Sequence, residues 1–337
     1  MKSALKNILW ACAYYLGLNA IFRARHKDRI RVLMYHGVAK SEFDPPQWAQ
    51  LNIDAFVWQM RYVQKHFSSM PVSGIGEGSY PGKSVVITFD DGLQNVFENA
   101  LPVLRELYLK AVCFVLPGLS EEKKCIWPNR VFEIFVNTSH ESIDLTEFSL
   151  PRYDIKAADK ISKARYAHEL TTRLKSFSHN ARNRVLQYLE DKCGGLDLRH
   201  YADFRLMTMD KIKTLSESAE FEIGLHTNTH PILSTQTRDE QSAEISGCRK
   251  KLDDAGIKYI CMFAYPNGRN QDFNDDSVAI LKENGIKAAF TTEDGFFNPG
   301  DDLFHIKRIP VGADMGRFEF AARLSGFYYF MRSLIGR

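Results

Sequence analysis

Two acidic residues and two histidines, each pair at the end of a strand-like run, are the residues of this sequence best placed to do chemistry. Asp90 and Asp91 follow one such run, and His226 and His230 follow another. Adjacent carboxylates next to a core repel each other and lose hydration unless a cation or a proton lies between them. Taken separately, each pair has an ordinary alternative: a turn with Asp91 as a helix N-cap, and two surface or capping histidines.

Together the two pairs predict a metal site. Asp91, His226 and His230 form a set of two histidines and one carboxylate, which leaves positions open on a divalent ion for water and substrate. Pro231 disfavours a helix at the histidines, so a strand end and loop should carry them rather than a zinc-binding helix. Asp90 lies beside this set without being needed as a ligand, and we predict that it is the general base for the water.

Three further residues are candidates for catalytic or supporting roles. His36 follows the run 30–35 and is predicted to protonate a departing amine, although a histidine buried in the core would give the same pattern. His305, in the last apolar run, is the alternative acid. Arg308 faces the opposite way from His305 and is the candidate cation that orients Asp90; otherwise both are ordinary surface or ion-pair residues.

The apolar run within 262–268 enters a turn made of proline, asparagine and glycine. On its own this pattern indicates only a turn. At a strand end in a barrel, however, the backbone N–H of Tyr265 can point into the site and stabilise an oxyanion.

The elements that must position these residues alternate between strand and helix. Strands are expected at 30–35, 85–89, 111–116, 221–225, 260–264 and 287–291, with a last strand within 304–311. Helices are expected at 54–66, 96–107, 236–255 and 275–284. Repeated strand–helix units predict a parallel sheet, and this many units in about 280 residues favours an α/β fold with a closed or nearly closed barrel over two separate domains.

The alternation breaks at about 121–204, where helical periodicity over 161–174 and 181–189 predicts a helical insertion in the barrel. The lysines and arginines of this segment indicate a solvated face, with contact to an anionic membrane or substrate as the alternative.

The composition is that of a globular protein without a strong electrostatic field. The chain has 337 residues, of which 45% are apolar and 25% charged, and 44 basic against 41 acidic residues give a net charge of +3. The apolar fraction argues against a largely disordered chain, and the small net charge argues against nucleic-acid binding. The six cysteines lie far apart and form no C-x-x-C pair, which favours reduced thiols.

Both ends of the chain depart from that average. Residues 4–22 carry one charge and precede a strongly basic segment, 23–31. We expect a membrane-directed N-terminal helix within 1–29; the alternatives are a helix packed on the body, a membrane span and a cleaved signal. The amphipathic tail 312–337 can lie on the same membrane face. If the N-terminal segment spans the membrane, its basic flank places the catalytic body on the cytoplasmic side.

The segments 88–92 and 226–230 resemble the first two motifs of the NodB-homology polysaccharide deacetylases, a carbohydrate esterase family. Thr-Phe-Asp-Asp-Gly matches the first motif and His-Thr-x-x-His the second, and the similarity covers roughly residues 30–311. The resemblance implies a distorted (β/α) barrel and one divalent metal ion, commonly zinc, on the Asp/His/His set. It also implies that Asp90 is the base in removing an N-acetyl group from an amino sugar.

The sequence departs from the family's pattern at two places. The third motif usually begins with an arginine that tethers the catalytic aspartate, whereas this chain has Phe-Ala-Tyr-Pro at 263–266. Arg308 is the substitute that we expect, and Tyr265 keeps the oxyanion role. The late Leu-x-x-His-Asp motif is absent, while residues 34–38 are similar to those of the biofilm poly-N-acetylglucosamine deacetylases, whose acid histidine lies early. This similarity favours His36 as the acid.

We therefore expect a metal-dependent hydrolase that removes an N-acetyl or similar small acyl group from an amino sugar. Its substrate would be a cell-envelope polysaccharide or a lipid-linked precursor at a membrane surface. A barrel glycosidase that uses Asp90 with another acid is weaker, because it leaves the paired histidines unexplained. The alternative from a different class is a non-catalytic, metal-stabilised carbohydrate-binding protein of a membrane assembly.

Overall fold

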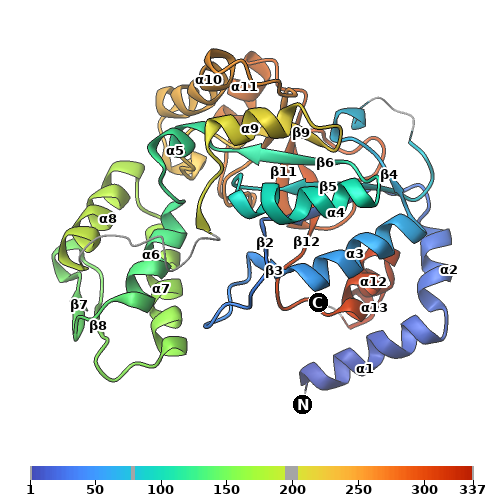
Figure 1. The fold of residues 1–337 in the computed structure, drawn as a ribbon, viewed down its shortest axis with the longest axis horizontal. Helices are drawn as coiled ribbons and strands as arrows, with labels where there is room; N and C mark the ends of the chain where they lie inside the picture. Colours follow the sequence, from blue (N-terminus) through green and yellow to red (C-terminus); the bar gives the residue numbers. More distant parts are fainter. Residues whose placement is uncertain (1, 77–79, 194–203, 336–337) are drawn as a thin grey trace.

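A closed parallel barrel forms the body of the protein in the computed structural model, which describes residues 2–76, 80–193 and 204–335 (Figure 1). Among the described residues, seven strands lie in the ring in the order β1, β12, β11, β10, β9, β6 and β5, and pairing of β1 with β5 closes it. Their bounds are β1 Arg31–Tyr35, β5 Ser84–Phe89, β6 Ala111–Val115, β9 Phe221–Leu225, β10 Met262–Ala264, β11 Ala288–Asp294 and β12 Ile306–Pro310. The short strand β4 (Ser68–Ser69) pairs with β5 outside the ring. The predicted (β/α) barrel is confirmed.

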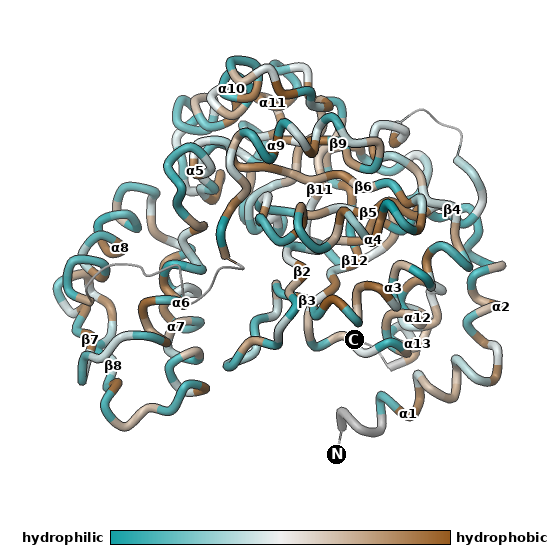
Figure 2. Tube along the Cα trace, in the orientation of Figure 1, coloured by the Kyte–Doolittle hydropathy of each residue, from teal (hydrophilic) through white to brown (hydrophobic). Residues whose placement is uncertain are grey.

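Side chains alternate between the two faces of each strand, and this alternation separates the barrel interior from the layer beneath the helices. Val32 belongs to the interior cluster, whereas its neighbour Leu33 belongs to the cluster that packs against the helices. Gly224 also faces the interior, where a Cβ atom would overlap the Phe114 ring. Figure 2 shows hydrophobic residues gathered along the central strands and hydrophilic residues along outer helices such as α8 and α10.

Amphipathic helices cover the outside of the barrel. They are α3 Ile53–His66, a π-helical turn Val96–Ala100 that continues into α4 Leu101–Glu106, α9 Met209–Ser216, α10 Arg238–Asp254 and α11 Asp275–Glu283. Thr237 and Glu240 form a capping box on α10, which satisfies backbone N–H groups that the first turn leaves without partners. The helices predicted between the strands are present, although the π-helical turn divides the one at 96–107.

The helical insertion packs around a core of its own and forms a lobe beside the barrel (Figure 1). The helix α5 Pro117–Glu122 leads into it and packs on the barrel core through Leu119, and the lobe contains α6 Trp127–Asn137, α7 Lys160–Leu174 and α8 His179–Cys193. The insertion predicted at about 121–204 corresponds to this lobe as far as residue 193, and residues 194–203 of the predicted range lie outside the described residues; one correction applies. An antiparallel hairpin of β7 (Ser142–Asp144) and β8 (Arg152–Asp154) interrupts the helices. Each strand has three residues, too few for an alternating pattern to be recognised in the sequence.

A small parallel pair of strands, β2 (Gly37–Ala39) and β3 (Gln50–Asn52), follows β1 at the C-terminal end of the barrel. It begins directly after His36 and so fixes the backbone on both sides of that residue. Short 3-10 turns lie at Val72–Gly74, Thr146–Phe148 and Leu233–Thr235.

The two ends of the chain pack against each other on one side of the barrel (Figure 1). Their helices are α1 Lys2–Tyr15, α2 Leu18–Arg25, α12 Arg317–Ser325 and α13 Phe327–Ile335. Trp10 and Ala13 of α1 pack on Ala322 and Phe327. The segments predicted to share a membrane face are therefore in contact. Among the described helices, none has the length and apolar character that crossing a membrane requires.

Candidate metal centre and active site

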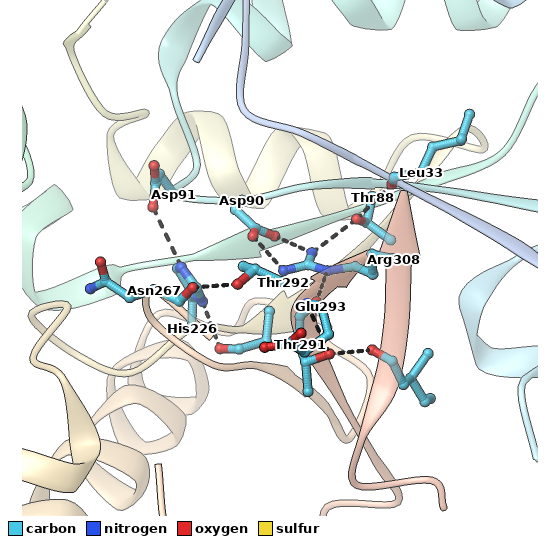
Figure 3. Close-up of polar contacts among 12 residues, drawn as sticks. Leu33, Thr88, Asp90, Asp91, His226, Asn267, Thr291, Thr292, Glu293 and Arg308 are labelled. Carbon is cyan, nitrogen blue, oxygen red and sulfur yellow. Dashed lines mark hydrogen bonds and ion pairs between the residues drawn. The ribbon is translucent and has the colours of Figure 1, made fainter. Parts of the chain in front are cut away.

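The predicted metal ligands Asp91, His226 and His230 lie together at the C-terminal ends of β5 and β9, and all three are buried. Asp91 Oδ1 is 3.4 Å from His226 Nε2 and 3.5 Å from His230 Nε2. One donor atom of each residue lies within 4.8 Å of the other two. Figure 3 shows Asp91 and His226 facing each other at the end of the barrel. The fold thus brings together residues that are far apart in the sequence.

This group fits a divalent ion with tetrahedral coordination. Ligand atoms that lie about 2.0–2.1 Å from zinc at tetrahedral angles are separated by about 3.4 Å, and both measured separations agree with this value. His226 Nδ1 lies 2.6 Å from the Ala264 carbonyl oxygen, so Nδ1 carries the proton and Nε2 is free to bind a metal. Asp91 Oδ1 is buried and has no hydrogen-bond partner among the described residues. A cation would remove the cost of burying that oxygen.

Left-handed backbone and one glutamate shape the loop that carries the histidines. Thr227 and His230 have φ angles of 70° and 63°, a conformation that strains non-glycine residues by about 1–3 kcal/mol each and persists only where the surroundings impose it. From α10, Glu244 accepts hydrogen bonds from the N–H groups of Asn228 and Thr229, at 2.9 and 2.8 Å, and from the Thr229 hydroxyl at 2.6 Å. Glu244 therefore supplies the constraint, a role that motif spacing did not indicate.

Two of the three predicted ligands, Asp91 and His230, have charge states that suit metal binding. Burial alone would lower the pKa of His226, but its contact with Asp91 and the charges of Asp90 and Asp91 raise it. Burial by itself would raise the pKa of Asp91, but its close contact with His226 and the nearby histidine charges hold that pKa below its ordinary range. Burial lowers the pKa of His230 to about 3. An ionised carboxylate and a neutral imidazole are the forms that bind a metal ion. Neither residue therefore has to lose a proton at neutral pH before the ion binds.

Asp90 and Arg308 form a buried ion pair beside the metal ligands (Figure 3). Arg308 Nη1 and Nη2 donate to the two Asp90 carboxylate oxygens, each at 2.7 Å. The same guanidinium donates to Thr88 Oγ1 at 3.0 Å and, through Nε, to the Thr291 carbonyl at 2.8 Å. Burial alone would raise the pKa of Asp90, but the charge and hydrogen bonds of Arg308 hold it below its ordinary range. The predicted contact between Arg308 and Asp90 is present, and it leaves Asp90 ionised.

A cavity of about 420 Å³ brings the candidate catalytic residues to one space. Its lining includes His36, Asp90, the three metal ligands and Tyr265, whereas Arg308 lies beneath it in the barrel. The insertion contributes Ile126, Pro128, Asn129 and Lys175 to the rim. His36 contacts the Trp48 ring at 5.5 Å, and its buried Nδ1 has no hydrogen-bond partner among the described residues. A larger, open cavity between α1 and α12 contains none of these catalytic candidates.

His305, the alternative acid, is not part of this cavity. It lies at the N-terminal end of β12 with its side chain 44% exposed, and its Nδ1 is 2.6 Å from Asp302 Oδ2. Because the described cavity lining excludes His305, the geometry favours His36 over His305 for protonating a leaving group.

The oxyanion role predicted for the Tyr265 N–H is wrong, because that N–H already donates to the Phe290 carbonyl at 3.1 Å. The neighbouring turn offers a different donor. Asn267 lines the cavity, and its side-chain Nδ2 is buried without a hydrogen-bond partner in the described part of the chain. Its backbone is left-handed, with φ 58°, a conformation that asparagine tolerates. The sequence indicated the turn at 266–268 but not that Asn267 lines the cavity with an unpartnered amide nitrogen.

Comparison with known proteins identifies the family. A model of the family described as polysaccharide deacetylase matches residues 77–289, which is more than half of the chain. The chain belongs to the polysaccharide deacetylase family. This is a family of deacetylase enzymes that act on acetylated saccharides, so the class of enzyme predicted from the sequence is confirmed. The matched segment contains both motifs that carry the candidate metal ligands, while His36 and Arg308 lie outside it.

Individual relatives are distant in sequence. YxkH of Bacillus subtilis, a protein provisionally named as a polysaccharide deacetylase, is 23% identical over 116 residues, and the match covers 34% of this chain and 40% of YxkH. The Streptococcus pyogenes deacetylase PplD is 18% identical with a TM-score of 0.58, covering 88% of this chain and 98% of PplD. IcaB from Ammonifex degensii is 19% identical with a TM-score of 0.56, covering 88% and 97%. These two structures support the fold of the polysaccharide deacetylases.

Proposed function

We propose that this polysaccharide deacetylase is a zinc-dependent hydrolase that removes an N-acetyl group from an amino sugar. The observation that carries the proposal is the buried Asp/His/His group beside the ion pair of Asp90 and Arg308 in one cavity. Asp91, His226 and His230 would hold the ion. When bound, the ion supplies Lewis acidity, which polarises an acyl carbonyl and makes water a better nucleophile.

The residues of the chain account for the remaining steps of amide hydrolysis. Asp90, ionised and fixed in orientation by Arg308, removes a proton from the water whose oxygen bonds to the acyl carbon. The Asn267 amide donates to the oxygen on which negative charge develops. His36 gives a proton to the sugar nitrogen as the carbon–nitrogen bond breaks, so that an amine and acetate leave.

The described cavity lining argues against the glycosidase alternative. Its carboxylates are Asp90 and Asp91; Asp91 belongs to the metal group, and Asp90 is paired with Arg308. A retaining glycosidase needs two carboxyl groups about 5 Å apart on either side of one bond, and an inverting enzyme needs them about 6.5–9.5 Å apart. The described lining supplies no second carboxylate for either arrangement.

We also propose that the protein works at an anionic membrane surface, where a lipid-linked saccharide would be accessible. Exposed apolar side chains of the terminal helices support this proposal: Tyr15 is 77%, Leu16 74% and Ile21 63% exposed. Arg25 and Lys27 are exposed nearby. An amphipathic surface with basic residues is attracted to anionic lipid headgroups and buries its apolar residues among them.

Vesicle sedimentation tests the membrane proposal. The full chain is expected to sediment with phosphatidylglycerol vesicles and to be released by high salt or by the Leu16→Ser, Ile21→Ser double variant. Tyr108→Ser is the matched control, because Tyr108 is 87% exposed and lies between α4 and β6, outside the terminal helices. Equal sedimentation of the double variant and the wild type would contradict a role of the terminal helices in binding.

Acetate release tests the catalytic proposal without knowledge of the natural sugar. The purified protein is assayed on a generic acetyl ester and on N-acetylated oligosaccharides, before and after chelation and after zinc is restored. Activity should disappear with the chelator, return with zinc and be absent in Asp91→Ala. Asp302→Ala, which removes an exposed carboxylate outside the cavity, should retain activity. Zinc binding without acetate release from any substrate would favour the carbohydrate-binding alternative.

A further inference from the structure

A second cavity, of about 250 Å³, lies in the insertion next to the catalytic cavity. Its lining includes Trp127 and Arg130 of α6 and Arg182 of α8. Two residues of the first turn of α6, Pro128 and Asn129, line the catalytic cavity. The two cavities are therefore neighbours across the first turn of α6, and Thr229, from the loop between the metal-binding histidines, also lines the second one.

Arg182 is a buried cation without a counter-ion in this cavity. Its side chain is 1% exposed, and Nε, Nη1 and Nη2 have no hydrogen-bond partner among the described residues. Its guanidinium carbon lies 4.7 Å from the centre of the Trp127 ring, a favourable contact that leaves the guanidinium N–H groups without acceptors. Burial lowers the pKa of Arg182 to about 10, so the group remains charged at neutral pH.

The other cations of the cavity are already compensated. Arg130 Nε donates to Glu190 at 2.7 Å, and Lys124 Nζ lies 2.9 Å from Glu122. Among the arginines and lysines of the described lining, Arg182 therefore lacks a counter-ion. A buried, unpaired guanidinium is costly, and an anion that accepts its N–H groups removes that cost.

The groups around Arg182 are suited to an oxyanion. A guanidinium presents its N–H groups in a planar fork that matches phosphate and carboxylate oxygens. His179 also lines the cavity, and its buried Nδ1 has no partner in the described part of the chain. The amide nitrogen of Asn183 contacts His179 Nε2 at 2.8 Å, and that of Gln187 donates to Asp191 at 2.8 Å. Thr229 and the pair of Lys124 and Glu122 complete the polar lining. With His179 Nε2 accepting from Asn183, its Nδ1 can donate, so the guanidinium fork and this imidazole N–H together offer donors to the oxygens of a phosphate group.

We propose that the Arg182 cavity binds a phosphate group carried by the saccharide substrate, which deepens the proposed function and rests on it. A saccharide that presents its acetamido group to the metal ligands would extend across the start of α6 and place a phosphate at Arg182. The insertion would then select a phosphorylated amino sugar, such as one attached to a lipid through phosphate, over a neutral one.

Phosphate binding tests the site independently of catalysis. Inorganic phosphate is titrated calorimetrically into the zinc-loaded full chain and into Asp91→Asn, which removes the metal as a second place for phosphate. A phosphate site should persist in Asp91→Asn and weaken at least tenfold when Arg182→Gln is added. Arg173→Gln is the matched control, because Arg173 is an exposed arginine of the same insertion, paired with Glu169 at 3.0 Å.

Two results would overturn the site. One is phosphate binding that Arg182→Gln leaves unchanged. The other is the absence of phosphate binding in Asp91→Asn. If Arg182→Gln fails to fold, Arg182→Lys serves instead: phosphate should raise the melting temperature of the wild type clearly more than that of Arg182→Lys, and equal increases would refute the proposal.

Acetate release distinguishes the source of the phosphate. For a phosphorylated N-acetylglucosamine, Arg182→Gln should lower kcat/KM at least tenfold, mainly through KM, while kcat/KM for a neutral N-acetylated oligosaccharide stays unchanged. Equal effects on both substrates, with phosphate binding lost in the variant, would assign the site to free phosphate and overturn the substrate assignment. If the wild type releases no acetate from either substrate but still binds phosphate, the proposed function is refuted and the oxyanion site is not.

Discussion

Replacement of Arg308 by glutamine tests whether this residue keeps Asp90 ionised inside the barrel. The change removes two hydrogen bonds of 2.7 Å to Asp90 and those to Thr88 and the Thr291 carbonyl. Two unit charges about 4 Å apart attract by about 4 kcal/mol at an effective dielectric constant of 20, and removal of one partner of a buried pair typically costs about 3–5 kcal/mol. We expect the free energy of unfolding at pH 7 to fall by about 3–5 kcal/mol.

The pH dependence gives this prediction its sign. In the wild type the pKa of Asp90 is lowered, because Arg308 outweighs burial. Its ionised form therefore contributes stability above the unfolded pKa, and this contribution is lost as the pH falls through the lower folded pKa. In Arg308→Gln burial acts without that cation and raises the pKa of Asp90 above its ordinary value. The destabilisation relative to the wild type should then be largest near pH 7 and smaller at acidic pH, where Asp90 is neutral in the variant.

Urea unfolding between pH 4.5 and 8, together with pH profiles of kcat/KM, measures both effects. The acidic limb of the kcat/KM profile should move to higher pH in Arg308→Gln, because the base must be deprotonated to act. Arg238→Gln is the matched control: Arg238 also contacts two carboxylates, at 2.8 and 2.7 Å, but with its side chain 44% exposed, so its loss should change stability far less. If Arg308→Gln lowers the free energy of unfolding as little as Arg238→Gln does, and this decrease does not depend on pH, the reasoning is refuted.

Five further changes probe the rest of the site. Chelation should lower the melting temperature as well as activity, because zinc at 100 times its Kd stabilises the folded state by about 2.7 kcal/mol; an unchanged melting temperature would contradict a buried metal site. His36→Gln should reduce kcat by about 10²–10⁴ with an amide substrate, whereas His305→Gln should have little effect, and the reverse order would reassign the acid. Asn267→Ala should lower kcat by about 10²–10³ with little change in KM; a change confined to KM would make Asn267 a binding residue. Glu244→Ala should weaken zinc binding by about 10–100-fold in a competition titration with a chelator, and unchanged affinity would remove Glu244 from the support of the loop.

The insertion shows how a segment outside the catalytic motifs can define the site. Lys175, Asn129 and Pro128 contribute to the rim of the catalytic cavity although they come from a lobe with its own core. The rim therefore depends on how this lobe packs against the barrel, and substitutions in the insertion that leave the barrel folded should alter substrate choice more than bond cleavage.

The sequence by itself determined the barrel and the candidate metal ligands. Apolar runs that end in Asp90-Asp91 and in His226 carry both their strand character and their chemistry within a few residues, and parallel strands bring their C-terminal ends to one edge of the barrel. Local pattern also indicated the insertion and the outer helices. The short hairpin at 142–154 was missed because three-residue strands carry too little periodicity.

Only the tertiary structure decided which of the remaining candidates act in the site. The register of β12 against β1 and β11 carries Arg308 to Asp90, whereas His305, three residues earlier, pairs with Asp302 at the surface. The N–H of Tyr265 donates to Phe290 across the sheet, whereas Asn267 lines the cavity with its amide nitrogen unpartnered among the described residues. Residue type and spacing limit what a side chain can do, but burial, free hydrogen-bonding groups and partners across the barrel arise from contacts between segments far apart in the sequence, which a local pattern does not contain.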